Sequence, residues 1–334
     1  SLSRAELESF AEVYGQPKYR GKQMFDAMYK HGVRNLEEMT QVPKAFREEM
    51  RKSFVEVGRS KIHHIVEAKD GTVKMLLQLA DNRVVETVGI PASKASNPRL
   101  TVCVSSQVGC PMRCTFCATG KGGFARNLEP HEIADQVLSI QEHFQQRVSH
   151  VVFMGMGEPM LNIPSVLAAH RSLNEDLGIG ARNITISTVG VPNSLMKLAQ
   201  HQLQSTLAVS LHAANQELRT QLIPSAKVYS IDALLDDCHS YFLATKRRIS
   251  FEYTLLEGVN DDPRQAAELA RQLRKHHCAS HINLIPWNPV DEADVTFARP
   301  SKTRINNFKI ALEKAGITTS VRETRGLEAA AACG

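Results

Sequence analysis

The sequence has no long hydrophobic run and no recognisable signal peptide. No apolar stretch reaches the roughly 18 residues that a membrane-spanning helix requires, so we expect a soluble protein with no membrane partner. Seven cysteines, an odd number, without a secretory signal indicate a reducing compartment in which thiols serve chemistry. We expect a cytoplasmic protein. The chain starts with Ser1, and if a transit segment has been removed, an organelle matrix or stroma is the alternative.

The sequence also lacks a strong excess of charge. Its net charge of +5 is compatible with an anionic partner but too small to demonstrate one. One segment, 17–34, is more basic, because it carries a single acid, Asp26. Its other charged side chains are Lys18, Arg20, Lys22, Lys30 and Arg34, interleaved with Tyr19, Phe25 and Tyr29. This composition suits phosphate contact and base stacking, and it equally suits an amphipathic helix with a solvated face.

A fourth metal ligand is missing from the cysteine motif that follows the strand-like run 100–104. Cys110, Cys114 and Cys117 form C-x-x-x-C-x-x-C, no second C-x-x-C follows, and the next histidine is His131. A structural zinc site needs four ligands, and a redox dithiol would leave Cys110 unexplained. Three thiolates can instead hold one face of a cubane 4Fe-4S cluster, whose fourth iron stays open to a substrate or cosubstrate.

Periodicity divides the chain into three parts. We predict a helical domain over 1–58, because a capping box begins at Ser3 and apolar residues follow at helical spacing. Short β-rich runs with Asp-Gly and Asp-Asn turns predict a β meander and linker over 59–98. From 99 to 334, strands and helices alternate, which indicates a parallel sheet covered by helices.

The third part contains six strand candidates. They are 100–104, 151–154, 184–188, 206–210, 249–254 and 282–285, and a last helix over 302–315 precedes a final run, 318–322. A doubly wound sheet and an open barrel both fit this alternation. Reactive or small polar groups follow most of the strands, and barrel active sites lie at that end. We therefore predict an α/β fold, an open (β/α)6 TIM-like barrel.

The polar residues at these strand ends are individually weak signals. They are Gly157-Glu158 after the second strand, Ser187 at the third, Ser210-Leu211-His212 at the fourth and Asn288 after the sixth. Each could belong to a turn or satisfy backbone groups. Their shared position on one face of the barrel makes them a candidate site together.

Two cysteines outside the cluster motif need separate interpretation. Cys103 lies in the first strand candidate and Cys333 near the chain end. A cysteine is commonly a small buried hydrophobe, and we assign that role to Cys238 and Cys278 on helical runs. For Cys103 and Cys333 we expect chemistry.

The longest motifs resemble a known family. The cysteine spacing resembles that of radical S-adenosylmethionine (SAM) enzymes, and the wider set resembles the RlmN branch of the RlmN/Cfr RNA methyltransferases over essentially the whole chain. The matching segments are 103–110 (CVSSQVGC), 124–128 (FARNL), 154–159 (MGMGEP), 283–289 (NLIPWNP), 321–326 (VRETRG) and 332–334 (ACG). Thr324-Arg325-Gly326 favours the C2-directed branch over the C8-directed Cfr branch.

The resemblance implies a radical mechanism that uses two SAM molecules per turnover. The first would methylate Cys333; the second, bound to the cluster, would give a radical that takes hydrogen from that methyl group. After addition to adenine C2, Cys103 would attack Cys333 and release the product with a disulfide. Glu86 matches the proton acceptor of the family. Gly157, Glu158, Ser187, Ser210, Leu211, His212 and Asn288 match positions expected to bind SAM, with Glu158 facing its amino group.

The resemblance also implies substrates and partners. The expected product is 2-methyladenosine in large-subunit rRNA and in tRNA next to the anticodon, with the target base unstacked. An electron donor such as flavodoxin or ferredoxin is expected, and the protein is expected to be a monomer. Two alternatives stay open: a C8-directed, Cfr-like methyltransferase, and an RNA-binding protein with a structural or redox-sensing Fe-S cluster.

Overall fold

The computed structural model describes residues 3–92, 99–278, 281–288 and 297–331. Its main element is a ten-stranded sheet in the order β1-β2-β3-β4-β7-β8-β9-β10-β11-β12. The strands are β1 Lys61–Glu67, β2 Val73–Gln78, β3 Val84–Pro91, β4 Leu100–Cys103, β7 His150–Phe153, β8 Ile184–Thr188, β9 Thr206–Ser210, β10 Ile249–Leu255, β11 His281–Pro286 and β12 Thr318–Val321. A separate hairpin pairs β5 Gln107–Gly109 with β6 Phe124–Asn127.

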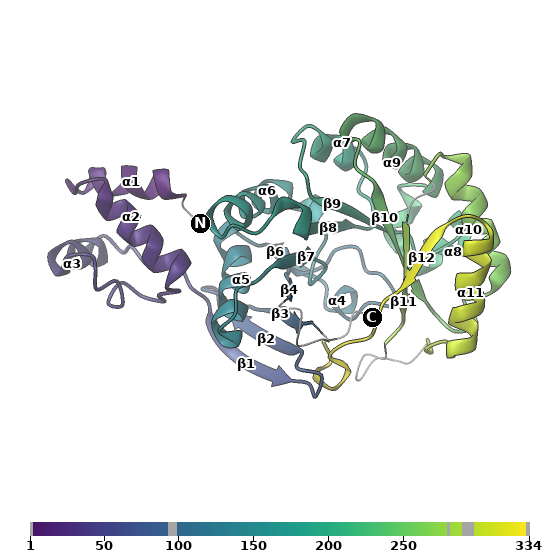
Figure 1. Ribbon diagram of the computed structural model, residues 1–334, viewed down its shortest axis with the longest axis horizontal. Helices are drawn as coiled ribbons and strands as arrows, with labels where there is room; N and C mark the ends of the chain where they lie inside the picture. Colours follow the sequence, from purple (N-terminus) through teal and green to yellow (C-terminus); the bar gives the residue numbers. More distant parts are fainter. Residues whose placement is uncertain (1–2, 93–98, 279–280, 289–296, 332–334) are drawn as a thin grey trace.

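The sheet has an antiparallel edge and a parallel body. The pairs from β1 to β4 are antiparallel, and the pairs from β4 to β12 are parallel. The parallel body curves into an open barrel (Figure 1). The predicted barrel is confirmed, with one addition: the final run 318–321 is β12, a further parallel strand paired with β11. The helix before it provides the crossover connection that a parallel pair requires.

Helices cover the outside of the parallel body (Figure 1). They are α5 Pro130–Phe144, α6 Ile163–Arg171, α7 Ser194–Ala199, α8 Gln216–Leu222, α9 Ile231–Thr245, α10 Pro263–Lys275 and α11 Lys302–Lys314, and the short α4 Ala118–Lys121 lies after the cysteine motif. The last of them, α11, is the helix expected over 302–315, and the short α4 and α8 were not predicted. The strands pack between these helices in one apolar core. In the described part of the chain, no helix is both long and apolar enough to cross a membrane.

The N-terminal helices form a module of their own beside the barrel (Figure 1). They are α1 Arg4–Val13, α2 Tyr19–Phe25, which continues as a π-helical turn over Asp26–Lys30, and α3 Lys44–Lys52. The predicted capping box is present, because Ser3 and Glu6 exchange hydrogen bonds at the start of α1. A separate apolar cluster holds the three helices together.

This cluster corrects part of the expectation for segment 17–34. Phe25 and Tyr29 are buried in it, so they cannot stack on RNA bases. Tyr19 is exposed, but the Arg20 guanidinium lies 4.7 Å from its ring centre. The structure buries the aromatics because they alternate with the charged residues along an amphipathic helix.

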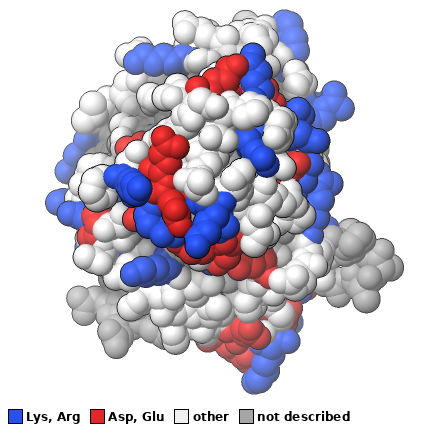
Figure 2. Space-filling model, turned by 90° about the vertical axis from the view of Figure 1, so that its left-hand side faces the viewer, with Lys and Arg blue, Asp and Glu red and all other residues white. Residues whose placement is uncertain are grey.

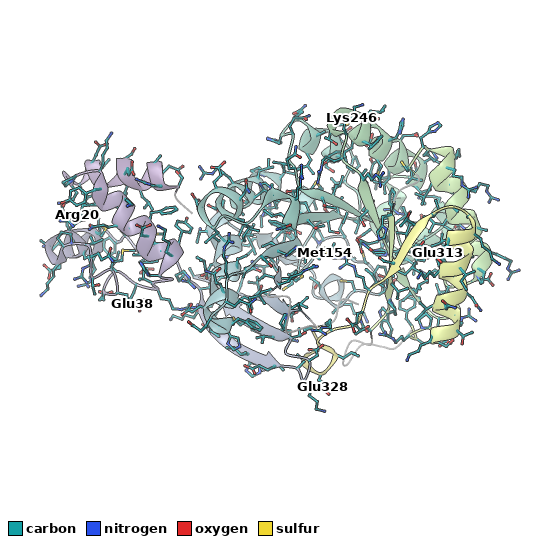
Figure 3. The ribbon with its side chains drawn as sticks, viewed as in Figure 1. Arg20, Glu38, Met154, Lys246, Glu313 and Glu328 are labelled. Carbon is teal, nitrogen blue, oxygen red and sulfur yellow. The ribbon has the colours of Figure 1, made fainter. Side chains whose placement is uncertain are left out.

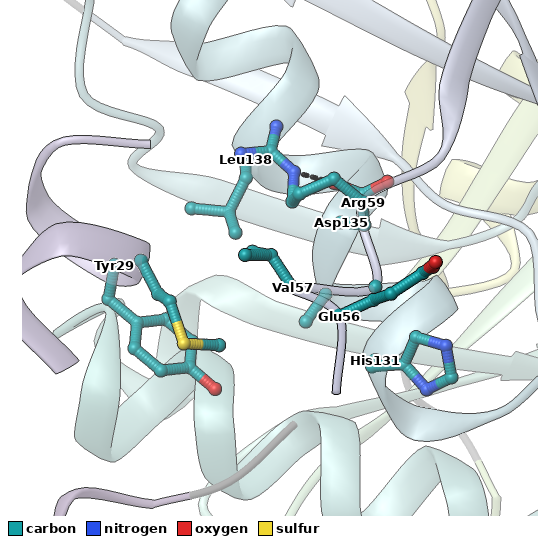
Figure 4. A pocket seen from close by; sticks show the side chains of 10 residues that line it. Tyr29, Glu56, Val57, Arg59, His131, Asp135 and Leu138 are labelled. Carbon is teal, nitrogen blue, oxygen red and sulfur yellow. Dashed lines mark hydrogen bonds and ion pairs between the residues drawn. The ribbon is translucent and has the colours of Figure 1, made fainter. Parts of the chain in front are cut away.

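A buried ion pair joins the module to the barrel. Arg59 pairs with Asp135, which lies on α5, and their side chains are 5% and 2% exposed. Asp135 also accepts a 2.7 Å hydrogen bond from the Ser60 backbone N–H. Figure 4 shows this pair above a cavity of about 250 Å³, which Tyr29, Val57 and His131 also line. Arg34 adds a 2.8 Å ion pair to Glu142 on α5.

Candidate active site

The three cysteines of the motif lie on a loop that begins at the β5–β6 hairpin. Gly109 has φ +76°, and a Cβ there would lie 2.0 Å from the Gly123 carbonyl oxygen, so only glycine fits. The Cys110 backbone N–H donates to the same Gly123 oxygen at 2.7 Å. The hairpin thus closes the loop directly before its first cysteine.

The rest of the loop is tied to two other elements of the barrel. The Thr115 N–H donates to the Leu222 carbonyl at the end of α8, at 3.0 Å. The Trp287 indole N–H, beyond β11, donates to the Phe116 carbonyl at 3.1 Å. The Phe116 ring meets His212 edge-on, with ring centres 4.9 Å apart. These contacts bring the end of α8 and the segments that follow β9 and β11 to the cysteine loop.

The thiols themselves are held in a largely apolar setting. Cys114 is buried, and Cys110 and Cys117 are half-buried. Burial raises the pKa of the Cys110 thiol to about 11, although the backbone N–H groups of Met112 and Gly157 favour its thiolate. Burial also raises the pKa of Cys114, and the neighbouring thiols add to the shift. The Cys110 and Cys114 thiols are therefore protonated at neutral pH without a metal, and metal binding must displace their protons.

The donor set fits a cubane cluster better than a single ion. Within the residues that the structure describes, no three His, Cys, Asp or Glu side chains converge as ligands of one metal ion would. Each thiolate of a cubane binds its own iron, so such convergence is not required. The three thiols nevertheless share one apolar cluster, and Cys110 and Cys117 lie close enough to Cys114 to raise its pKa.

Glu158 is a buried carboxyl group beside this loop. Its two oxygens accept bonds from the Met160 N–H at 2.9 Å and the Val189 N–H at 2.8 Å. Burial raises its pKa to about 6, although these bonds favour the charged form. In the described part of the chain no basic side chain pairs with it, so a bound cation would meet an uncompensated carboxylate.

Gly157 allows the approach of Glu158 to the loop. Its φ is +108°, and a Cβ there would lie 2.6 Å from the Gln107 Cβ. Gln107 then accepts the Glu158 N–H at 2.8 Å and donates to Asn127 at 2.8 Å. A side chain at position 157 would push this braced segment away from Cys110.

The three residues predicted at the end of β9 offer different chemical groups to a ligand. His212 has φ +58° and is 5% exposed, and its Nδ1 accepts the Thr254 N–H at 2.9 Å, which leaves the proton on Nε2. Burial lowers its pKa to about 3, so the imidazole stays neutral. Ser210 is half-buried at the strand end. Leu211 packs its side chain in the core, so only its backbone could face a ligand.

Ser187 and Asn288 lie at the ends of other barrel strands. Ser187, on β8, is 9% exposed and pairs in register with Ala208 of β9. Asn288 is 4% exposed, and its Oδ1 accepts a hydrogen bond from Arg299. The predicted residues thus come from β8, β9 and β11, at the end of the sheet that carries the cysteine loop.

Glu86 lies on the antiparallel edge and faces a cavity of about 380 Å³. Gly109, Phe124 and Met156 line the same cavity, which therefore borders the start of the cysteine loop. The side chain of Glu86 is exposed on β3, opposite Leu76 of β2 in the sheet register. Glu86 thus lies on the antiparallel meander rather than on one of the parallel strands.

The C-terminal segment returns to this edge of the sheet. The Gly326 N–H donates to Asp70 at 2.9 Å, Lys69 pairs with Glu328 at 2.9 Å, and the Lys74 ammonium donates to the Ala330 carbonyl at 3.2 Å. Figure 3 shows Glu328 beside the tip of the meander. Cys103 ends β4, the strand next to β3. Cys333 lies outside the described residues.

Two family profiles match the chain. The Radical SAM superfamily matches residues 104–319, and the ribosomal RNA large subunit methyltransferase N-terminal domain matches residues 1–55. A probable dual-specificity RNA methyltransferase RlmN from Acaryochloris marina is 57% identical over 332 residues, covering 99% of this chain and 92% of that protein. Its counterpart from Trichormus variabilis is 59% identical, covering 99% and 91%. The chain belongs to the RlmN family of radical SAM methyltransferases.

A solved structure agrees with this membership of the RlmN family. A radical SAM methyltransferase from Sphaerobacter thermophilus superposes with a TM-score of 0.92 at 40% identity, covering 100% of this chain and 97% of that one. The hydrogenase maturase HydG from Carboxydothermus hydrogenoformans, at 15% identity and a TM-score of 0.52, shares the fold alone. The predicted family and fold class are confirmed.

Sequence reasoning on this RlmN-family chain missed one buried charge near the cysteine loop. Arg219, on α8, is 1% exposed. Its signal was present, because Arg219 and Leu222 are one helical turn apart on the face that packs inward. Because α8 itself was not predicted, the spacing of Arg219 and Leu222 could not be interpreted as a buried helix face.

Proposed function

We propose that the protein methylates C2 of adenine in large-subunit rRNA and in tRNA next to the anticodon. The relatives at 57% and 59% identity carry the name dual-specificity RNA methyltransferase. The observation that carries the proposal is the cavity shared by Glu86 and Gly109. It gives an unstacked base one opening that borders both an exposed carboxylate and the loop of three thiols.

Cys110, Cys114 and Cys117 would hold the 4Fe-4S cluster. When bound, the cluster supplies the electron for reductive cleavage of SAM, a reaction that amino-acid side chains do not perform. Apolar residues, Met112, Phe116 and Trp287 among them, pack around the thiols and limit their contact with water. We expect the electron to come from a flavodoxin or a ferredoxin.

Glu158 would bind the amino group of SAM, because its buried carboxylate has no cationic partner in the described part of the chain. Neutral His212 can donate from Nε2, and Ser187, Ser210 and Asn288 offer further polar groups at strand ends. Gly157 and Leu211 would contribute backbone. Two SAM molecules per turnover would use this one site in succession.

Glu86 would accept the proton that leaves adenine C2 when aromaticity is restored. Cys333 would carry the methyl group, and Cys103 would resolve the covalent intermediate by thiol exchange. The return of residues 325–331 to the meander supports this assignment, because these residues contact the meander that also carries Glu86.

The three parts of the chain would have separate tasks. The module, residues 1–58, would bind RNA; the meander and linker, 59–98, would carry Glu86; and residues 99–334 would form the catalytic barrel. Arg20 lies on the module, far from Met154 at the barrel mouth (Figure 3), so RNA would span both parts. We propose a cytoplasmic monomer.

Nucleoside analysis tests this function. RNA from cells lacking the protein, treated with reconstituted enzyme, SAM and reductant, should yield 2-methyladenosine on digestion. Methylation at C8 would instead assign the Cfr-like reaction. Failure to cleave SAM at all would assign the RNA-binding alternative with a structural cluster.

A further inference from the structure

Arg219 is a buried cation with no carboxylate partner among the described residues. Its Nη2 donates to the Val189 carbonyl at 2.5 Å, and its Nη1 to the Tyr229 carbonyl at 3.4 Å. Its Nε is buried with no hydrogen-bond partner. Burial lowers its pKa to about 10, so the side chain is still charged at neutral pH. Keeping an unpaired charge in the interior is costly unless something else compensates it.

The candidate for the compensating charge lies in the cysteine loop, where metal binding would convert the thiols to thiolates. Leu222, one turn after Arg219, accepts two bonds from Thr115, at 3.0 Å from the N–H and 3.3 Å from the hydroxyl. Leu222 and Cys114 belong to the same apolar cluster. Among the charged groups near Arg219, the Cys114 thiolate would raise the pKa of Arg219 most. Arg219 in turn lowers the pKa of Cys114 and so favours its thiolate.

Arg219 is also fixed relative to Glu158. Both side chains bind the same residue after β8: Arg219 donates to the Val189 carbonyl, and Glu158 accepts the Val189 N–H. The cation therefore has a set position between α8 and the loop that holds the carboxylate. A preorganised charge of this kind acts without reorganisation cost.

We propose that Arg219 supplies the fixed positive charge that offsets the three thiolates and raises the reduction potential of the cluster. The proposal rests on the proposed cluster at Cys110, Cys114 and Cys117. On reduction, one electron from a one-electron donor enters the cluster, no bond forms or breaks, and no proton moves. The negative charge near Arg219 grows by one, so the guanidinium stabilises the reduced state more than the oxidised state.

A redox titration of reconstituted protein tests this role. Wild type, Arg219→Lys, Arg219→Gln and Arg219→Met would be titrated anaerobically with dithionite and mediators, and the reduced cluster followed by electron paramagnetic resonance. The Gln and Met variants should disfavour reduction at least tenfold, which is about 59 mV for one electron. The Lys variant keeps the charge and should titrate close to wild type.

Arg247→Gln is the matched control. Arg247 also has a buried Nε without a partner, but it precedes β10 at the end of the sheet away from the mouth. Its loss should leave the potential unchanged.

The role is overturned if the Gln or Met variant binds full iron and titrates like wild type. It is equally overturned if the Lys variant shifts as far as Gln, because Arg219 would then act only by holding Val189 and Tyr229. Iron content and circular dichroism identify which neutral variant folds, and one folded neutral variant, Gln or Met, is sufficient for the comparison. A Lys variant that shifts by tenfold or more overturns the role even without them. A wild-type protein without iron would contradict the proposed cluster as well, and the iron assay records that separately.

Discussion

Charged side chains are exposed and form ion pairs in the N-terminal module. At the barrel mouth, where the strand ends meet the cysteine loop, they are buried and form none among the described residues. In segment 17–34, Lys18 pairs with Glu12 at 3.6 Å and Lys30 with Asp26 at 2.6 Å, both in solvent. Figure 2 shows Lys and Arg interspersed with Asp and Glu on this side of the molecule. At the mouth, Glu158 and Arg219 are buried and form no ion pair among the described residues.

The difference indicates where ligands act on the protein. Exposed pairs contribute little to stability and exchange readily for other ions, which suits contact with RNA phosphates. The charges at the mouth are desolvated and bonded only to neutral backbone groups. A bound ligand of opposite charge would therefore stabilise them. We expect substitutions at the mouth to abolish function and substitutions in the module to weaken it.

The largest effect is expected at the cysteine loop. Cys114→Ala should abolish the cluster absorbance and all methylation, because two thiolates cannot hold the cubane face. Cys278→Ala, which removes a buried thiol bonded to the Leu235 carbonyl, should keep its iron. Iron and sulfide analysis checks both. Tightly bound zinc with full activity would contradict the assignment.

The next effect concerns the junction between the two regions. Asp135→Ala leaves the buried Arg59 with only the more exposed Glu142, at 3.2 Å, as a carboxylate partner. It should lower the free energy of unfolding by about 3 kcal/mol, because the buried half of the pair is lost. Glu37→Ala removes an exposed pair with Arg51 and should leave the urea midpoint unchanged. Equal midpoints for the two variants would show that the junction pair does not stabilise the fold.

Glu158 should give the mouth a pH dependence. Its pKa is raised to about 6, so SAM affinity should fall as the pH drops below 6 and the carboxyl becomes protonated. Glu158→Gln should bind SAM weakly at every pH. The sign for stability is opposite: the raised pKa favours the folded state below the ordinary glutamate pKa of 4.5, and this contribution is lost as pH rises through 6. Isothermal titration between pH 5 and 8 measures the affinity, and a flat wild-type profile would remove Glu158 from the binding site.

The smallest effect is expected on the module surface. Replacing Lys18, Arg20 and Lys22 by Gln should weaken RNA binding and flatten its salt dependence. The log–log slope should fall by about 0.7 for each RNA phosphate that the variant no longer neutralises. Affinity measured across a salt series gives the slope.

A triple substitution on α11 is the control for net charge. Lys302, Lys309 and Lys314 lie on this helix at the other end of the molecule (Figure 1). If their removal flattens the slope as much as the module substitutions do, the effect reflects total charge and segment 17–34 is an ordinary solvated face.

The sequence was sufficient for the barrel and for the candidate residues near its mouth. Apolar strands alternating with capped helices predict parallel pairing, and the spacing of Cys110, Cys114 and Cys117 requires no tertiary information. The pairing of β12 could not be predicted, because a four-residue strand carries little pattern and its register depends on β11. Burial of Arg219 was missed for a similar reason: a seven-residue helix gives a weak periodic signal, and only packing reveals which side chain it encloses.

Cys333 should carry the methyl group and Cys103 should release the product, and single substitutions of the two cysteines separate these roles. Cys103→Ala should methylate Cys333 and add to adenine but then stall. Denaturing electrophoresis should show a protein–RNA adduct that ribonuclease removes, and Cys333→Ala should show none. Normal turnover by Cys103→Ala, or trapped RNA with Cys333→Ala, would contradict the account.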